Sequence, residues 1–140
     1  QWWVNIEIKD ASGTHADATI VEKVVALVEE LEMEEQVLIS SFNLEYLRRV
    51  KAANPALATG ALINKATPDP LALLRELGAD AYHPSLKILQ AEQVKLLRQA
   101  GYGVNVWTVN EEADMRALVA MGVTGIFTDF PQVLSKILQP

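Results

Sequence analysis

A glutamate and a lysine lie two positions apart in the segment Asn5–Lys9, which reads NIEIK. Successive side chains of a strand alternate between its faces, so Glu7 and Lys9 would share one face while Ile6 and Ile8 share the other. A carboxylate that faces an interior is costly unless it is paired or bound to a metal. The spacing therefore indicates either an ion pair or a site for a hard cation such as Mg²⁺ or Ca²⁺, which prefers oxygen ligands.

Polar and aromatic residues also come at the ends of the other apolar runs: Ser40, Ser41, Phe42, Asn64, Lys65, His83, Trp107, Asn110, Thr128 and Asp129. Each has a structural alternative. Trp107 either packs or contacts a ligand, and Asp129 either caps a helix or contacts a substrate. Asn110 precedes two glutamates, which favours a helix N-cap. Ser40 and Ser41 have no partner base nearby in the sequence, so a nucleophile is only weakly indicated. His83 follows a predicted strand and precedes Pro84, so it either lines the mouth of a site or packs.

Strand-like and helix-like segments alternate along the whole chain. The helical spacing of apolar residues predicts helices over 17–35, 43–55, 69–79, 90–103, 110–122 and 131–139. Short apolar runs predict strands at the N-terminus and over 36–42, 58–64, 80–85, 104–109 and 124–129. Predicted N-caps are Asp17, Asn43, Asp69 and Asn110, and predicted helix stops are Gly78, Gly101 and Gly122.

Strict alternation of this kind indicates parallel strands joined by helices. An open nucleotide-binding sheet should carry a glycine-rich turn after its first strand, and the chain has no G-x-G-x-x-G motif. A complete (β/α)8 TIM barrel needs eight units and about 250 residues. The predicted fold is therefore α/β, an incomplete TIM barrel of about six βα units, in which residues 1–140 form a single partial domain lacking the first two strands.

Composition excludes several functions. The formal net charge of −6 argues against nucleic-acid binding, and no apolar run is long enough to span a membrane. The chain has no cysteine, which excludes a zinc–thiolate site and fits a cytoplasmic location, and its two histidines, His15 and His83, lack metal-ligand spacing. The chain begins with Gln1 rather than Met, so we expect the sequence to start within a longer fold.

Four stretches, taken together and in this order, resemble the glycerophosphodiester phosphodiesterase family: NIEIK (5–9), VLISSFN (37–43), VNVWTVNEEADMRALVAMGV (104–123) and GIFTDFP (125–131). The resemblance implies a (β/α)8 barrel and the metal-dependent hydrolysis of glycerophosphodiesters to glycerol 3-phosphate and an alcohol. It further implies that Glu7 is a ligand of a divalent cation, Mg²⁺ or Ca²⁺. Lys9 would bind the phosphate and Trp107 would line the substrate pocket.

The family's two catalytic histidines and an acid-x-acid metal pair belong to segments that have no counterpart in this sequence. We therefore expect no catalytic residue in this chain and little activity from the chain alone. Two alternatives stay open: a naturally shortened phosphate-binding or assembly module, and one chain of a split enzyme. Because an incomplete barrel leaves two strand edges open, a homo-oligomer is also expected.

Overall fold

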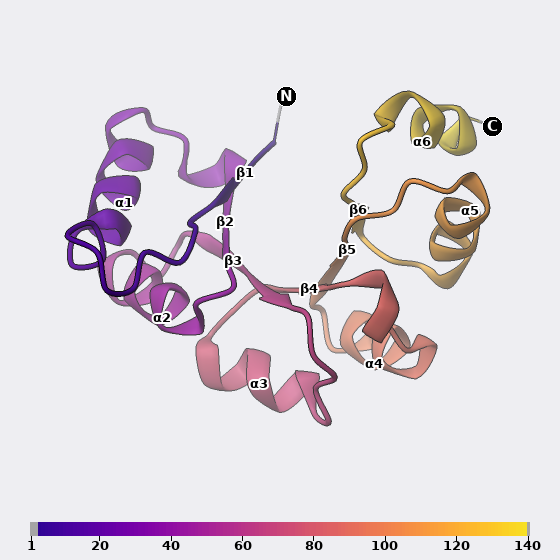
Figure 1. Cartoon of the computed structure of the whole chain (residues 1–140), viewed down its shortest axis with the longest axis horizontal. Helices are drawn as coiled ribbons and strands as arrows, with labels where there is room; N and C mark the ends of the chain where they lie inside the picture. Colours follow the sequence, from indigo (N-terminus) through magenta and orange to yellow (C-terminus); the bar gives the residue numbers. More distant parts are fainter. Residues whose placement is uncertain (1–2, 140) are drawn as a thin grey trace. The chain divides into compact units, whose positions relative to one another are not determined.

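The computed structural model describes residues 3–139, in which six strands alternate with six α-helices and two short 3₁₀ segments (Figure 1). The strands are β1 (Val4–Glu7), β2 (Val37–Ser41), β3 (Ala58–Ile63), β4 (Ala81–Pro84), β5 (Gly103–Val106) and β6 (Gly125–Ile126). The helices are α1 (Ile20–Glu30), α2 (Leu44–Ala53), α3 (Pro70–Leu77), α4 (Ala91–Gln99), α5 (Glu112–Met121) and α6 (Pro131–Leu138), and the 3₁₀ segments are η1 (Glu34–Gln36) and η2 (Leu86–Ile88). The strand order in the sheet, β1-β2-β3-β4-β5-β6, is the order in the sequence.

The chain divides into two compact units, which are described separately. The first unit comprises the residues up to Leu62 together with Ala72–Ala81, and the second comprises Ile63–Leu71 and the residues from Tyr82 onward.

In the first unit, the parallel strands β1, β2 and β3 lie side by side. Glu7 is opposite Ser40 in the register of β1 and β2, and Ser40 is opposite Gly60 in the register of β2 and β3. Beyond β3, the backbone N–H of Asp80 donates to the carbonyl of Thr59 at 2.9 Å, which places the approach to β4 next to β3. Parallel pairing brings the carboxyl ends of the three strands to one edge.

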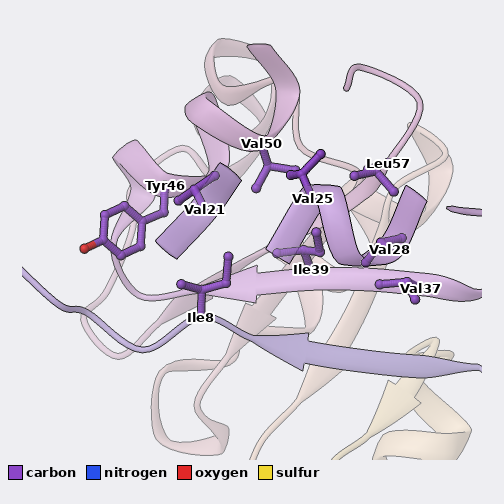
Figure 2. Close-up of a cluster of buried hydrophobic side chains, with 9 residues drawn as sticks. All are labelled: Ile8, Val21, Val25, Val28, Val37, Ile39, Tyr46, Val50 and Leu57. Carbon is purple, nitrogen blue, oxygen red and sulfur yellow. The ribbon is translucent and has the colours of Figure 1, made fainter. Parts of the chain in front are cut away.

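The core of the first unit lies between its strands and helices α1 and α2 (Figure 2). Every third or fourth residue of α1 is apolar, so one stripe of the helix faces the strands. The buried cluster consists of Ile8, Val21, Val25, Val28, Val37, Ile39, Tyr46, Val50 and Leu57. Ile8 belongs to this core while Glu7 and Lys9, its neighbours in the sequence, do not. This outcome matches the predicted alternation of faces.

In the second unit, β5 and β6 pair in parallel with Asn105 opposite Gly125. The end of β4 is joined to β5 by a parallel bridge between Ser85 and Trp107. The backbone N–H of Ser85 also donates to the carbonyl of Ile63 at 2.9 Å. The unit therefore repeats the parallel arrangement of the first.

Several predicted helix ends need correction. The helix predicted over 17–35 is α1, Ile20–Glu30, whose N-cap is Thr19 rather than Asp17. Glu32, with a φ of 52°, adopts a left-handed conformation that cannot continue a helix. Two other predictions are confirmed: the Asn43 side chain accepts a hydrogen bond from the backbone N–H of Glu45, and Gly122 ends α5 with a φ of 84°.

Candidate active site

Glu7 and Lys9 form an ion pair at the carboxyl end of β1. Lys9 Nζ lies 2.7 Å from Glu7 Oε1, and the side chains are 80% and 29% exposed, respectively. A cavity of about 330 Å³ opens beside this pair, against Ile20 and Val24 of α1. The pair therefore offers a solvent-accessible ammonium group and a half-buried carboxylate at one place, as its spacing predicted.

The two serines at the end of β2 are buried and engaged in structural hydrogen bonds. Ser40 Oγ accepts from Asn5 Nδ2 at 3.1 Å, and Ser41 Oγ donates to the carbonyl of Ile8 at 2.8 Å. Ser41 is fully buried and Ser40 almost so. A nucleophile needs access to substrate and a neighbouring base, so neither serine is placed as one.

Trp107 lines a cavity of about 390 Å³ in the second unit. Its indole Nε1 donates to the carbonyl of His83 at 2.7 Å, which fixes the plane of the ring. The other residues that line this cavity are Asn64, Ser85, Leu86, Lys87 and Thr108. An aromatic wall with amide, hydroxyl and ammonium groups around it is suited to a small polar molecule.

His83 is completely buried, with its ring centroid 5.3 Å from that of Phe127. Its Nε2 lies 2.9 Å from Asn105 Nδ2, while its Nδ1 has no hydrogen-bond partner in the described structure. Burial lowers the pKa of His83 to about 4. A neutral imidazole without access to solvent is not placed to transfer protons to a substrate.

Asn110 joins the loops that follow β5 and β6 instead of capping α5, which was the sequence prediction. The N-cap of α5 is Glu111, so that prediction is wrong. Asn110 Nδ2 donates to Asp129 Oδ2 at 2.8 Å, and its Oδ1 accepts from the backbone N–H of Asp129 at 3.0 Å. Asp129 does not cap α6 either, since the N-cap of that helix is Phe130 without a side-chain cap. Asn110 and Asp129 thus connect the two loops that follow β5 and β6.

A complete metal site is not formed by the residues that the structure describes. No group of three or more Asp, Glu or His side chains in residues 3–139 is arranged to hold an ion. Glu7 supplies a single carboxylate, and one of its oxygens already accepts from Lys9. Divalent hard cations take six or more oxygen ligands, counting waters, so Glu7 fits as one ligand of a site and not as the site itself.

Two features of these strand ends were missed in the sequence. Lys87 lines the same cavity as Trp107, although it lies in a short segment that carried no periodic signal. Asn43 was predicted only as a helix cap, yet its Nδ2 also donates to Asp10 Oδ1 at 3.0 Å. No spacing rule could reveal that second contact, because the residues are far apart in the sequence.

The model of the Glycerophosphoryl diester phosphodiesterase family matches residues 3–133. The chain belongs to this family. It is 35% identical over 136 residues to the glycerophosphodiester phosphodiesterase of Caldanaerobacter subterraneus, covering 97% of this chain and 55% of that protein. It is 32% identical over 136 residues to the enzyme of the same name from Bacillus altitudinis, covering 96% of this chain and 55% of the relative. The chain thus spans about half the length of these family members.

Solved glycerophosphodiester phosphodiesterases share the fold. The crystal structure of the enzyme from Parabacteroides distasonis matches with a TM-score of 0.86 at 26% identity, over 97% of this chain and 57% of that one. A phosphodiesterase from Oleispira antarctica, solved in complex with the product sn-glycerol-3-phosphate, matches with a TM-score of 0.80 at 26% identity, over 97% of this chain and 55% of that one. The predicted fold class, an incomplete TIM barrel of about six βα units, is confirmed. No helix among the described residues of this family member is long and apolar enough to cross a membrane.

Proposed function

We propose that this chain forms the phosphate-binding and pocket-lining part of a site for the metal-dependent hydrolysis of glycerophosphodiesters to glycerol 3-phosphate and an alcohol. The observation that carries the proposal is the Glu7–Lys9 pair at the carboxyl end of β1, the edge at which barrel enzymes place their chemistry. Membership of the family supports the reaction class. The product sn-glycerol-3-phosphate bound to the Oleispira antarctica relative supports the ligand class.

In this proposal, Lys9 binds the phosphate. Its ammonium group is exposed and carries three donors, so it can pair with phosphate oxygens without first paying a large desolvation cost. Charge on those oxygens grows as the diester is cleaved, and a fixed cation stabilises that growth. Trp107, held by the carbonyl of His83, is proposed separately as a residue that lines a substrate pocket in the second unit.

Glu7 is proposed to contribute one carboxylate to a divalent-cation site, for Mg²⁺ or Ca²⁺. The cation, when bound, would neutralise charge on the phosphoryl oxygens. When a phosphate takes the Lys9 ammonium, Glu7 Oε1 is released from its present partner and becomes available as an oxygen ligand. Among residues 3–139, Glu7 does not belong to any group of three or more Asp, Glu or His side chains that could hold the ion.

Proton transfer is not assigned to this chain. Its only two histidines are the buried His83 and His15, which lies in the exposed loop before α1. We therefore propose that the chain alone binds phosphate esters but hydrolyses them negligibly. A second candidate function is a non-catalytic phosphate-binding or assembly module, or one chain of a split enzyme. It is favoured by the complete burial of His83 and by the structural hydrogen bonds of Ser40 and Ser41.

The test is the release of glycerol 3-phosphate from glycerophosphocholine, measured with and without Mg²⁺ or Ca²⁺, for the chain alone and for Glu7→Gln. We expect no release above the uncatalysed rate in any condition. Turnover by the chain that is lost in Glu7→Gln would show that it is a complete catalyst, and would overturn the proposal that the chain alone hydrolyses phosphate esters negligibly.

A further inference from the structure

The backbone around Lys9 is held by side chains from the neighbouring strand end. Ile8 is fixed at both of its backbone polar groups: its N–H donates to the carbonyl of Ser40 at 2.8 Å, and its carbonyl accepts from Ser41 Oγ at 2.8 Å. The Ser41 hydroxyl in turn accepts from the backbone N–H of Asn43 at 3.0 Å. The residue just before Lys9 is therefore immobilised.

The segment after Lys9 is fixed by Asn43. Asn43 Nδ2 donates to Asp10 Oδ1 at 3.0 Å and to Ser12 Oγ at 3.2 Å. Asp10 Oδ1 also accepts from the N–H and the hydroxyl of Ser12. These hydrogen bonds, chiefly those from Ser12 and then that from Asn43, lower the pKa of Asp10, so an ionised acceptor is maintained. In addition, the N–H of Ala11 donates to Tyr46 Oη.

We infer that Ser41 and Asn43 are positioning residues, which hold the segment 8–12 so that Lys9 is presented at a fixed place for an incoming phosphate ester. The inference rests on the proposed function of Lys9 and adds the residues that position it. Lys9 is itself 80% exposed and its ammonium group contacts Glu7, so much of its placement depends on the backbone that carries it. A fixed backbone on both sides limits the volume that its ammonium group explores, and a preorganised charge binds with less loss of entropy.

Asn43 allows the positioning role to be separated from helix capping. Its Oδ1 accepts from the N–H of Glu45 and caps α2, whereas its Nδ2 makes the contacts with Asp10 and Ser12. Asn43→Asp retains the capping oxygen, because Asp and Asn cap equally well. It removes the donor and places a second carboxylate next to Asp10.

The chain offers a matched control for Ser41. Ser40 is the adjacent serine and is almost as deeply buried, but its hydroxyl accepts from Asn5 and does not touch the segment 8–12. Ser40→Ala therefore removes a buried hydroxyl from the same strand without removing a contact that positions Lys9.

The experiment measures ¹⁵N relaxation of the amides of residues 9–12 and, by chemical-shift titration, the affinity for sn-glycerol 3-phosphate. In Ser41→Ala and Asn43→Asp we expect order parameters to fall from about 0.85 to below about 0.6. Affinity should weaken several-fold, while the melting temperature of Asn43→Asp stays close to that of the parent. Ser40→Ala should keep both the order and the affinity.

Unchanged order of residues 9–12 in Asn43→Asp would overturn the inference, and so would a loss of order without any loss of affinity. Lys9→Gln separates this failure from that of the proposed function. If Lys9→Gln binds glycerol 3-phosphate as tightly as the parent, the proposed role of Lys9 is wrong. The order parameters of residues 9–12 are measured without ligand, so they still test the positioning role of Ser41 and Asn43.

Discussion

Asn105 Nδ2 lies 2.9 Å from His83 Nε2, and the same amide group fills the space beside Gly125. A Cβ added at position 125 would come within 2.7 Å of Asn105 Oδ1 and 3.2 Å of its Cγ. Gly125 is therefore needed so that Asn105 can reach the buried histidine. Asn105 thus lies between His83 on one side and Gly125 on the other in the second unit.

Gly125→Ala should destabilise the protein by about 1–3 kcal/mol, because the added methyl group displaces a side chain that is hydrogen-bonded to His83. Asn105→Ala removes the obstacle, so the methyl should cost much less in the double variant. Urea unfolding of the parent, the two single variants and the double variant gives the coupling free energy, expected at about 0.5–3 kcal/mol. Strictly additive effects would show that the two residues do not compete for this space.

His83 makes stability depend on pH. Burial lowers its pKa to about 4, from an ordinary value of 6.5, so the folded state favours the neutral ring. The contribution of the neutral His83 ring to the free energy of unfolding is complete above pH 6.5. It is lost as the pH falls from 6.5 towards 4, because the unfolded state then binds a proton that the folded state does not. A shift of one pKa unit corresponds to about 1.4 kcal/mol, so about 2 kcal/mol should be lost between pH 6.5 and pH 5.

The measurement is urea unfolding at pH 7 and pH 5 for the parent and for His83→Gln. The parent should lose more stability than the variant over this interval, and NMR titration of the ring should show no midpoint above pH 5. A midpoint near 6.5 would contradict the account of His83 as a buried, neutral group.

The ion pair between Glu7 and Lys9 should contribute little to stability. Exposed ion pairs typically contribute less than about 1 kcal/mol, and Lys9 is 80% exposed. Lys9→Gln should therefore lower the free energy of unfolding by less than about 1 kcal/mol. In contrast, Ser41→Ala should cost about 1–3 kcal/mol, because it leaves the buried carbonyl of Ile8 without its donor. A large loss in Lys9→Gln would indicate a structural role for the pair.

Self-association through β1 is also expected. Within the described residues β1 pairs only with β2, and Val4 on this strand is 38% exposed. An open edge with apolar side chains favours pairing with another copy, and a lysine at such an edge opposes it. Sedimentation equilibrium should show a dimer or larger assembly for the parent and a shift towards monomer for Val4→Lys. A monomeric parent over the whole accessible concentration range would refute this prediction.

The order and type of the elements could be predicted from the sequence because each unit carries local signals. The apolar spacing of Val21, Val25 and Val28 indicates a helix, and the alternation of Ile6 and Ile8 with Glu7 and Lys9 indicates a strand with two different faces. Caps were less predictable. Asp17 and Asn110 are good capping residues in isolation, but in the structure Asp17 accepts from Tyr46 Oη and Asn110 binds Asp129.

The contacts around the candidate site could be predicted only in part. The Glu7–Lys9 contact is local and follows from strand geometry. The contacts of Ser41 with Ile8, of Asn43 with Asp10 and of His83 with Asn105 join residues 22–33 positions apart. They depend on strand register, which periodicity does not give. The roles of Glu7, Lys9 and Trp107 toward metal and substrate stay predictions.

The most direct test of the central claim is a titration of the isotope-labelled chain with sn-glycerol 3-phosphate, followed by ¹H–¹⁵N correlation spectra with and without Mg²⁺. The account predicts saturable shifts for the amides of Glu7, Ile8 and Lys9. The shifts at residues 7–9 should be strongly reduced in Lys9→Gln and retained in Lys23→Gln, a control at an exposed lysine of α1. Saturable binding that leaves residues 7–9 unperturbed, or that is the same in Lys9→Gln, would contradict the assignment of the phosphate site to this strand end.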